Sequence, residues 1–124
     1  MDVVLSGIAE SEDVYLYTYG EPRCGNEAFA DYMDTFVPNA YRVVHYEDIV
    51  PHIPPGEVVV PLYEHHSTEI WYNYDFSNYT VCGTNEDPNC SDSLWTFDLS
   101  IEQHRVYFDM RPAGSCSKKS IKYK

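Results

Sequence analysis

The first half of the chain alternates between strand-forming and helix-forming sequence, and this order limits most strongly which folds are open to it. Val14–Tyr19 is rich in aromatic and β-branched residues and stops at Gly20, as a strand does. Asn26 is a suitable N-cap for a helix that runs to about Phe36. Tyr41–Tyr46 then reads as a second strand. A strand, a helix and a strand in so short a stretch predict a βαβ unit with parallel strands and a right-handed crossover.

The side-chain pattern of this unit predicts how it packs. The first strand lacks a clean alternation of polar and apolar residues, which favours a strand covered on both faces, as in a parallel sheet. Four apolar residues of the helix recur at helical spacing and are expected to face the core: Phe29, Tyr32, Met33 and Phe36. With 124 residues the chain is expected to form one α/β domain at most.

The pattern changes in the second half of the chain. Prolines and a glycine in residues 51–56 predict a rigid loop, and Val58–Tyr63 is a short extended run. Thr68–Tyr74 is expected to form another strand, with an antiparallel pairing to its neighbour as one alternative. Residues 75–93 have the composition of a loop, and residues 94–108 are expected to contain a short helical segment.

The charge of the chain excludes some classes of partner. There are 20 acidic residues against 8 basic ones, which gives a formal net charge of −12. This balance argues against nucleic acid and against electrostatic docking on anionic membranes. Residues 109–124 are expected to form a disordered basic tail, with an interaction tail as the alternative, because four lysines crowd the C-terminus: Lys118, Lys119, Lys122 and Lys124. No stretch is long and apolar enough to predict a transmembrane segment.

Two of the four cysteines are expected to form a disulfide. Cys82 and Cys90 enclose a run of turn-forming residues that can close a small loop. A zinc site is the competing interpretation, but the sequence has neither a Cys-x-x-Cys nor a paired His-x₃-His spacing. Cys24 is expected to be a buried free thiol, and Cys116 is a candidate partner for Cys24 or for a cysteine outside this sequence.

Two sequons accompany this disulfide loop. Asn78-Tyr79-Thr80 and Asn89-Cys90-Ser91 both satisfy the N-glycosylation pattern, which makes Asn78 and Asn89 candidate modification sites. Together with the disulfide they favour an extracellular or secreted protein. The segment Met1–Ser6 has no features of a signal peptide, so an export signal is expected in sequence that precedes it.

Three segments carry a resemblance to a known family. They are residues 19–30, residues 41–55 around Asp48-Ile49-Val50-Pro51-His52-Ile53-Pro54-Pro55, and the segment from Gln103 to Phe108 around His104. Taken alone, an Asp after a strand is usually a turn or cap residue. In this succession, however, the chain resembles the C-terminal half of a class 3 (fungal-type) lipase, most clearly over residues 14–108.

The resemblance implies a fold, a chemistry and two site residues. The fold would be a partial α/β-hydrolase fold, namely the C-terminal strands of a mainly parallel sheet with helices. Asp48 would be the triad acid and His104 the general base in the hydrolysis of acylglycerols or related lipid esters, without metal or organic cofactor. Among the other histidines, His45 is expected to be packed within its strand. A metal site is a remote alternative for three residues: His65, His66 and Glu69.

The nucleophile of this mechanism is missing from the sequence. No Gly-x-Ser-x-Gly occurs, and none of five serines has the sequence of a nucleophile elbow around it: Ser6, Ser11, Ser67, Ser77 and Ser100. The chain alone is therefore expected to be inactive. The alternative function is that of a non-catalytic, lipase-like binding protein. In either case Val14–Tyr19 would leave a sheet edge open, through which the isolated chain is expected to self-associate.

Overall fold

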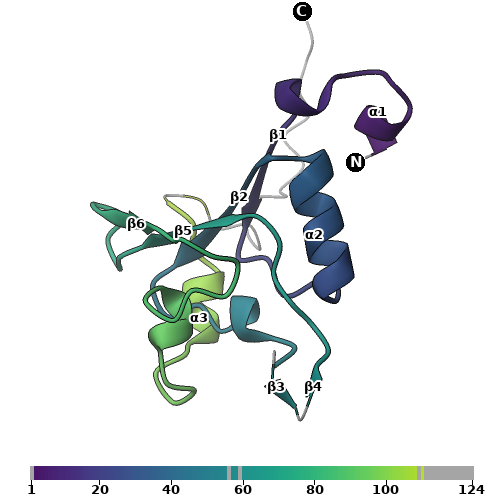
Figure 1. Ribbon diagram of the computed structural model, residues 1–124. Coiled ribbons are helices and arrows are strands. Elements are labelled where there is room, and N and C mark those ends of the chain that lie inside the picture. The colour runs from purple at the N-terminus through teal and green to yellow at the C-terminus, as the bar shows by residue number, and fades with distance from the viewer. Residues whose placement is uncertain (1, 56, 59, 109, 111–124) are drawn as a thin grey trace, which may run out of the picture.

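The computed structural model describes residues 2–55, 57–58, 60–108 and 110, and a four-stranded mixed sheet organises them (Figure 1). Its strands lie in the order β1-β2-β5-β6, with the bounds Tyr15–Tyr19, Asn39–His45, Thr68–Tyr72 and Tyr79–Val81. Strands β1, β2 and β5 are parallel, and β6 pairs antiparallel with β5. The alternative of an antiparallel pairing for the segment 68–74 is thus correct on its β6 side and wrong on its β2 side.

The predicted strand–helix–strand unit is confirmed. The helix between β1 and β2 is α2, Glu27–Phe36, which lies along the right side of the strands in Figure 1. Its N-cap is Asn26, whose side chain accepts a hydrogen bond from the backbone N–H of Phe29. The register pairs Tyr15 with Asn39 and Tyr19 with Val43, so that β1 and β2 end side by side.

The core lies between α2 and the first two strands. Its buried centre consists of Met33, Val37 and Ala40, with Phe29 and Phe36 packed partly against it. The expectation for Tyr32 was wrong, because 39 % of this residue is exposed. Tyr32 instead lies at the surface, where its ring packs on Phe36.

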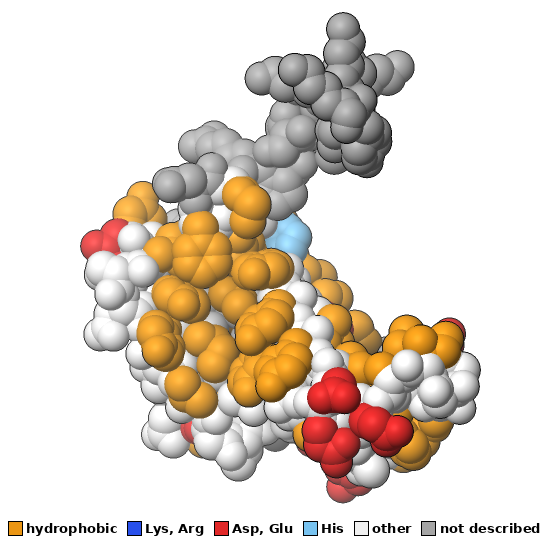
Figure 2. All heavy atoms as spheres, turned by 90° about the horizontal axis from the view of Figure 1, so that it is seen from above, with side chains coloured by type: hydrophobic (Ala, Val, Ile, Leu, Met, Phe, Trp, Pro, Cys, Tyr) orange, Lys and Arg blue, Asp and Glu red, His pale blue; other side chains and the backbone are white. Residues whose placement is uncertain are grey.

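Strand β1 is covered on one face only among the described residues, which corrects the expectation of a strand covered on both. Tyr15, Tyr17 and Tyr19 are exposed, whereas the intervening Leu16 and Thr18 are half-buried. This alternation could not be recognised in the sequence, because tyrosine combines a large apolar ring with a hydroxyl group and can be counted as polar or as apolar. Hydrophobic side chains gather in a broad patch on one face of the molecule (Figure 2).

The remaining elements are short. Two more α-helices are α1, Asp2–Leu5, and α3, Ile101–His104, and three 3₁₀ turns span Ser11–Asp13, Val50–His52 and Ser91–Ser93. The extended run predicted around Val58–Tyr63 is a small antiparallel hairpin of β3, Glu57–Val58, and β4, Val60–Pro61. The three-residue strand β6 was missed within the segment 75–93, since so few residues carry no periodic signal. The predicted tail 109–124 lies, apart from Met110, outside the described residues.

None of the helices that the structure describes has both the length and the apolar character needed to cross a bilayer.

Candidate active site

The candidate site lies where β1 and β2 end. Asp48 follows β2 by three residues and is fully buried. The chain there is tied to the segment before α3, because Ser100 donates its backbone N–H to the Glu47 carbonyl at 2.7 Å and accepts one from Ile49 at 3.3 Å. These bonds fix the loop that carries Asp48 against the segment that leads to His104.

Asp48 and His104, the two residues predicted from the sequence, come together in the structure. Nδ1 of His104 lies 3.0 Å from Oδ2 of Asp48. The Asp48 side chain is wholly buried, while 35 % of the His104 side chain is exposed. A carboxylate on Nδ1 favours the tautomer that leaves Nε2 free to accept a proton. The pair therefore has the geometry of the acid and base of a hydrolytic triad.

Short α3 sets the position of His104. The Ser100 side chain caps this helix by accepting the Glu102 backbone N–H at 3.2 Å. His104 is the last residue of the helix, whereas the sequence had suggested only a helical segment somewhere within residues 94–108. A single capped helical turn is thus sufficient to place the His104 imidazole against Asp48.

Tyr107 is a third member of the site that the sequence did not single out as functional. Its hydroxyl donates to Oδ2 of Asp48 at 2.6 Å and accepts the backbone N–H of His45 at 3.3 Å. Burial and the neighbouring Asp48 carboxylate raise the pKa of Tyr107 well above its ordinary value, so the hydroxyl remains a donor. Asp48 also accepts the Val50 backbone N–H on Oδ1 at 2.8 Å. Its two oxygens are therefore oriented from several directions.

Gly20 lies directly against the side chains of Asp48 and His104. A Cβ atom at this position would lie 2.7 Å from Nδ1 of His104 and 2.8 Å from Oδ2 of Asp48. The backbone at Gly20 has φ of +62°, which disfavours any residue with a side chain. In the sequence Gly20 was recognised as the end of a strand, but only the fold reveals how close it lies to the pair.

His45 is packed, as expected, and it supports the segment before His104. Its ring nitrogens lie 3.1 Å from the Gln103 carbonyl and 3.0 Å from the Tyr74 carbonyl. The ring stacks on Phe76 with centroids 4.1 Å apart, and the residue is 2 % exposed. Its position links β2 to the residue that precedes His104.

The remote metal site at His65, His66 and Glu69 is not formed. His65 faces Glu86 at 3.0 Å, His66 faces Glu21 at 3.1 Å, and Glu69 pairs with Arg42 at 3.4 Å. Within the described part of the chain, the one group with metal-ligand geometry is Glu69 with Cys82 and Cys90. Its two sulfurs form a disulfide and are therefore not thiolate ligands.

The structure does bring one serine next to an imidazole. Ser67 Oγ hydrogen-bonds to Nδ1 of His66, whose Nε2 faces Glu21. Ser67 is 6 % exposed, however, and its backbone N–H is already donated to Asp34 at 2.6 Å. Because Ser67 is buried, substrate has no access to it, and these hydrogen bonds instead link separate elements of the fold.

The cysteines give one confirmation and one correction. Cys82 and Cys90 form the predicted disulfide, with an S–S distance of 2.08 Å. Cys24 is exposed, not buried, because it follows β1 in a surface loop where its Sγ contacts Oε1 of Glu21 at 3.2 Å. Partial burial and that carboxylate raise the pKa of Cys24 to about 11, which makes it a poor nucleophile. Cys116 lies outside the described residues, so its pairing stays a prediction.

In comparisons with known proteins the chain is similar to lipases. Residues 1–58 match the family described as "Lipase (class 3)". A lipase of Rhizopus niveus is 37 % identical over 85 % of this chain and 26 % of its own length. A secreted mono- and diacylglycerol lipase of Fusarium solani is 34 % identical over 88 % of this chain and 33 % of its own length.

A solved structure supports the same relationship. It is a triacylglycerol lipase described as having a catalytic centre formed by a serine protease triad. The similarity has a TM-score of 0.76 at 34 % sequence identity, and covers 89 % of this chain and 41 % of that protein. The chain thus spans well under half the length of these relatives and has part of an α/β-hydrolase fold. With its βαβ unit and the paired Asp48 and His104, it matches part of the class 3 (fungal-type) lipases in both sequence and fold.

Proposed function

We propose that this chain supplies the acid and the base of a serine esterase that hydrolyses acylglycerols or related lipid esters. The observation that carries the proposal is the 3.0 Å approach of His104 Nδ1 to the fully buried Asp48. A buried carboxylate paired with a partly exposed imidazole is the arrangement that prepares a histidine to take a proton from a hydroxyl nucleophile. The triad described for a related triacylglycerol lipase supports this reading.

In this mechanism the residues of the site have separate roles. His104 takes the serine proton on Nε2 during attack on the ester carbonyl and then returns it to the leaving alcohol. Asp48 holds the ring in the required tautomer and stabilises the imidazolium that forms. Tyr107 and the Val50 backbone N–H keep the Asp48 carboxylate in position.

The serine of this mechanism lies outside the 124 residues, which contain no Gly-x-Ser-x-Gly. Without a nucleophile no acyl-enzyme forms, and water activated by His104 without an oxyanion hole reacts very slowly. We therefore expect the chain alone to show no hydrolysis of short-chain triglycerides above a buffer control.

A chimera tests the proposal directly. In it, residues 1–108 replace the matching segment of the Rhizopus niveus lipase, which keeps the remainder of that enzyme. We expect the chimera to hydrolyse tributyrin, and we expect Asp48→Asn and His104→Gln each to lower kcat by about 10⁴-fold. Glu102→Gln is the matched control, because this residue lies in the same helix with its side chain 70 % exposed. A folded chimera that is inactive, or that tolerates both substitutions, would favour the non-catalytic binding protein instead.

We also propose that the protein enters the secretory pathway. The Cys82–Cys90 disulfide supports an oxidising compartment, and the related Fusarium solani lipase is described as secreted. Immunodetection of the native protein in medium and cell fractions tests this. Recovery only from a reducing cell fraction, with both cysteines alkylated, would contradict it.

A further inference from the structure

The hairpin of β5 and β6 presents one of the two sequons on the protein surface. Trp71 pairs with Thr80 and Tyr72 with Tyr79, and the turn closes with a 3.1 Å bond from the Asn73 backbone N–H to the Asn78 carbonyl. Strand β6 is an edge of the sheet among the described residues, and Asn78 immediately precedes it. All three sequon residues, Asn78 to Thr80, are exposed.

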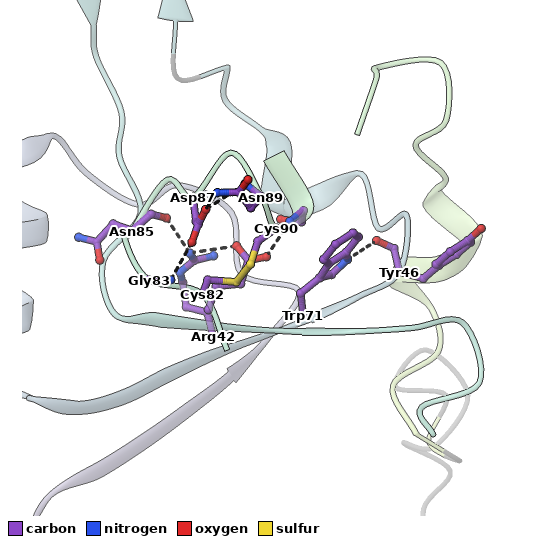
Figure 3. The surroundings of a disulfide bond; sticks show 11 residues. Arg42, Tyr46, Trp71, Cys82, Gly83, Asn85, Asp87, Asn89 and Cys90 are labelled. Carbon is purple, nitrogen blue, oxygen red and sulfur yellow. Dashed lines mark hydrogen bonds and ion pairs between the residues drawn. A yellow bond between two sulfur atoms is a disulfide. The ribbon is translucent and has the colours of Figure 1, made fainter. Parts of the chain in front are cut away.

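A shallow aromatic cavity adjoins this sequon. It has a volume of about 170 Å³, and its walls include Tyr46, Trp71, Asn78 and Thr80. The Trp71 indole is fixed there, because Nε1 donates to the Tyr46 carbonyl at 2.9 Å (Figure 3). A rigid aromatic surface with a few amide and hydroxyl groups suits a small, partly apolar and partly polar ring.

We propose that Asn78, and not Asn89, carries an N-linked glycan, and that its first N-acetylglucosamine lies over the cavity beside Trp71. In the transfer, Asn78 Nδ2 forms a bond to C1 of the sugar and loses one proton. The C1–O bond to a polyprenyl-diphosphate carrier breaks, and the diphosphate leaves with the electron pair. The proposal rests on entry into the secretory pathway, which supplies that lipid-linked oligosaccharide.

Asn89 is less suited to glycosylation than Asn78, because its side-chain Nδ2 is hydrogen-bonded and part of its sequon is buried. Asn89 Nδ2 donates to Oδ1 of Asp87 at 3.0 Å (Figure 3), and its backbone N–H donates to the same oxygen at 2.9 Å. Ser91, the third residue of that sequon, is 2 % exposed, and Cys90 between them is held in the disulfide. The Asn78 side chain, in contrast, accepts the Tyr79 backbone N–H on Oδ1, and its Nδ2 donates no hydrogen bond within the described residues.

A glycan at Asn78 would also protect the edge of the sheet. Tyr79 and Val81 of β6 are 55 % and 58 % exposed, and an edge strand with apolar side chains invites pairing with other chains. A bulky hydrophilic group beside this edge hinders such pairing and keeps the surface soluble.

Expression of the full chain behind a secretory leader in yeast tests the modification independently of the natural export route. We expect one glycan, seen as a gel shift that peptide N-glycosidase F removes, and its loss in Asn78→Gln and in Thr80→Ala. Thr80→Ser and Asn89→Gln should keep the shift. A shift that survives Asn78→Gln, a shift lost in Asn89→Gln, or no shift while a sequon added after Lys124 is glycosylated, would each overturn the proposal.

Tryptophan quenching tests where the first sugar lies. The chain has two tryptophans, so Trp95→Phe leaves Trp71 as the reporter. In that background the chain is trimmed to a single N-acetylglucosamine with an endoglycosidase and compared with Asn78→Gln. We expect the acrylamide quenching constant of Trp71 to fall by about half, since one face of the indole is covered. Equal quenching in the two forms would show that the sugar does not lie on the cavity.

Discussion

Gly20 and Tyr107 determine at the scale of single residues how the Asp48–His104 pair is held. Gly20 has no Cβ atom, which at this position would lie too close to both side chains of the pair, and Tyr107 donates a hydrogen bond to the carboxylate from inside the protein. Neither residue is expected to react with substrate. Both keep the imidazole and the carboxylate at the distance and orientation that the proposed chemistry requires.

We expect Gly20→Ala to destabilise the chimera by about 2–4 kcal/mol, because the methyl group combines a disfavoured φ with overpacking against His104. Gly7→Ala is a matched control, since Gly7 has φ of +68° but no atom within 4 Å of the added Cβ. It should cost about 1 kcal/mol from the backbone alone. Urea unfolding measures both, and equal losses would disprove the predicted close approach.

We expect Tyr107→Phe to lower the free energy of unfolding by about 1–3 kcal/mol, since it removes one donor to the buried Asp48 carboxylate and one acceptor for His45 N–H. Activity of the chimera should fall as well, and by less than in Asp48→Asn. Tyr74→Phe, at an exposed tyrosine, serves as the control. An unchanged unfolding midpoint for Tyr107→Phe would show that its hydroxyl does not support the site.

At the scale of elements, acidic side chains hold the loops onto the sheet. Arg23, next to the end of β1, binds Glu86 at 2.7 Å and Asp92 at 3.2 Å, and both lie in or next to the disulfide loop. Glu21 binds His66 at 3.1 Å and Thr18 at 2.6 Å. The loop that follows β1 is therefore joined to distant segments by charged groups. The stability of the fold should consequently depend on pH.

Acid should weaken these links over a defined range of pH. Burial alone would raise the pKa of Glu21, but hydrogen bonds from His66 and Thr18 outweigh it and lower the pKa from 4.5 to about 2. A carboxylate with a lowered pKa stabilises the fold above its unfolded value, and this contribution is lost as the pH falls from about 4.5 towards 2. We expect Glu21→Gln to flatten the stability of the chimera over this range, by up to about 1 kcal/mol after solvent screening. Glu102→Gln, at an exposed residue, should leave the curve unchanged.

The disulfide should stabilise the fold in proportion to its small loop. For the sequence separation of 8 between Cys82 and Cys90, loop closure predicts about 2–3 kcal/mol. We expect Cys82→Ser combined with Cys90→Ser to lower the free energy of unfolding of the chimera by that amount, measured by urea unfolding. Cys24→Ser is the control, since Cys24 is exposed and forms no disulfide among the described residues. A reducing agent should affect the parent and not the double variant; an equal effect on both would contradict this assignment.

At the scale of the whole molecule, one face of strand β1 is left open among the described residues. Tyr17 stacks on Tyr41 with centroids 5.3 Å apart, and Tyr19 meets Tyr107 edge to face at 5.8 Å, so an aromatic surface extends from β1 towards the site. Strand β1 is also an edge of the described sheet. An apolar face next to an unpaired edge favours association between chains.

We therefore expect the isolated chain to self-associate, in a way that depends on concentration. Light scattering during gel filtration should give a mass above that of a monomer, and Tyr15→Lys with Tyr17→Lys should shift the chain towards the monomer. Tyr74→Lys is the matched control, because Tyr74 is similarly exposed, at 65 %, but lies beyond β5. A parent chain that is a monomer with a sharp thermal transition would disprove the prediction.

The sequence by itself determined those features that depend on neighbouring residues. Strand β1, helix α2 with its Asn26 cap, strand β2 and the Cys82–Cys90 loop all follow from local propensity, capping and spacing, and the structure has each of them. Asp48 and His104 were also proposed from local segments, by resemblance to a family. Their pairing across 56 positions of sequence is a tertiary fact.

Only the tertiary structure decided the features that arise between distant segments. The exposure of Cys24 and of the tyrosines of β1, the roles of Gly20 and Tyr107 and the direction of β5 all depend on which surfaces meet. A residue such as tyrosine or glycine is compatible with several environments, and its own sequence context does not choose among them. The physical reason is that burial, hydrogen-bond partners and close approach are set by the packing of elements, which local sequence constrains but does not specify.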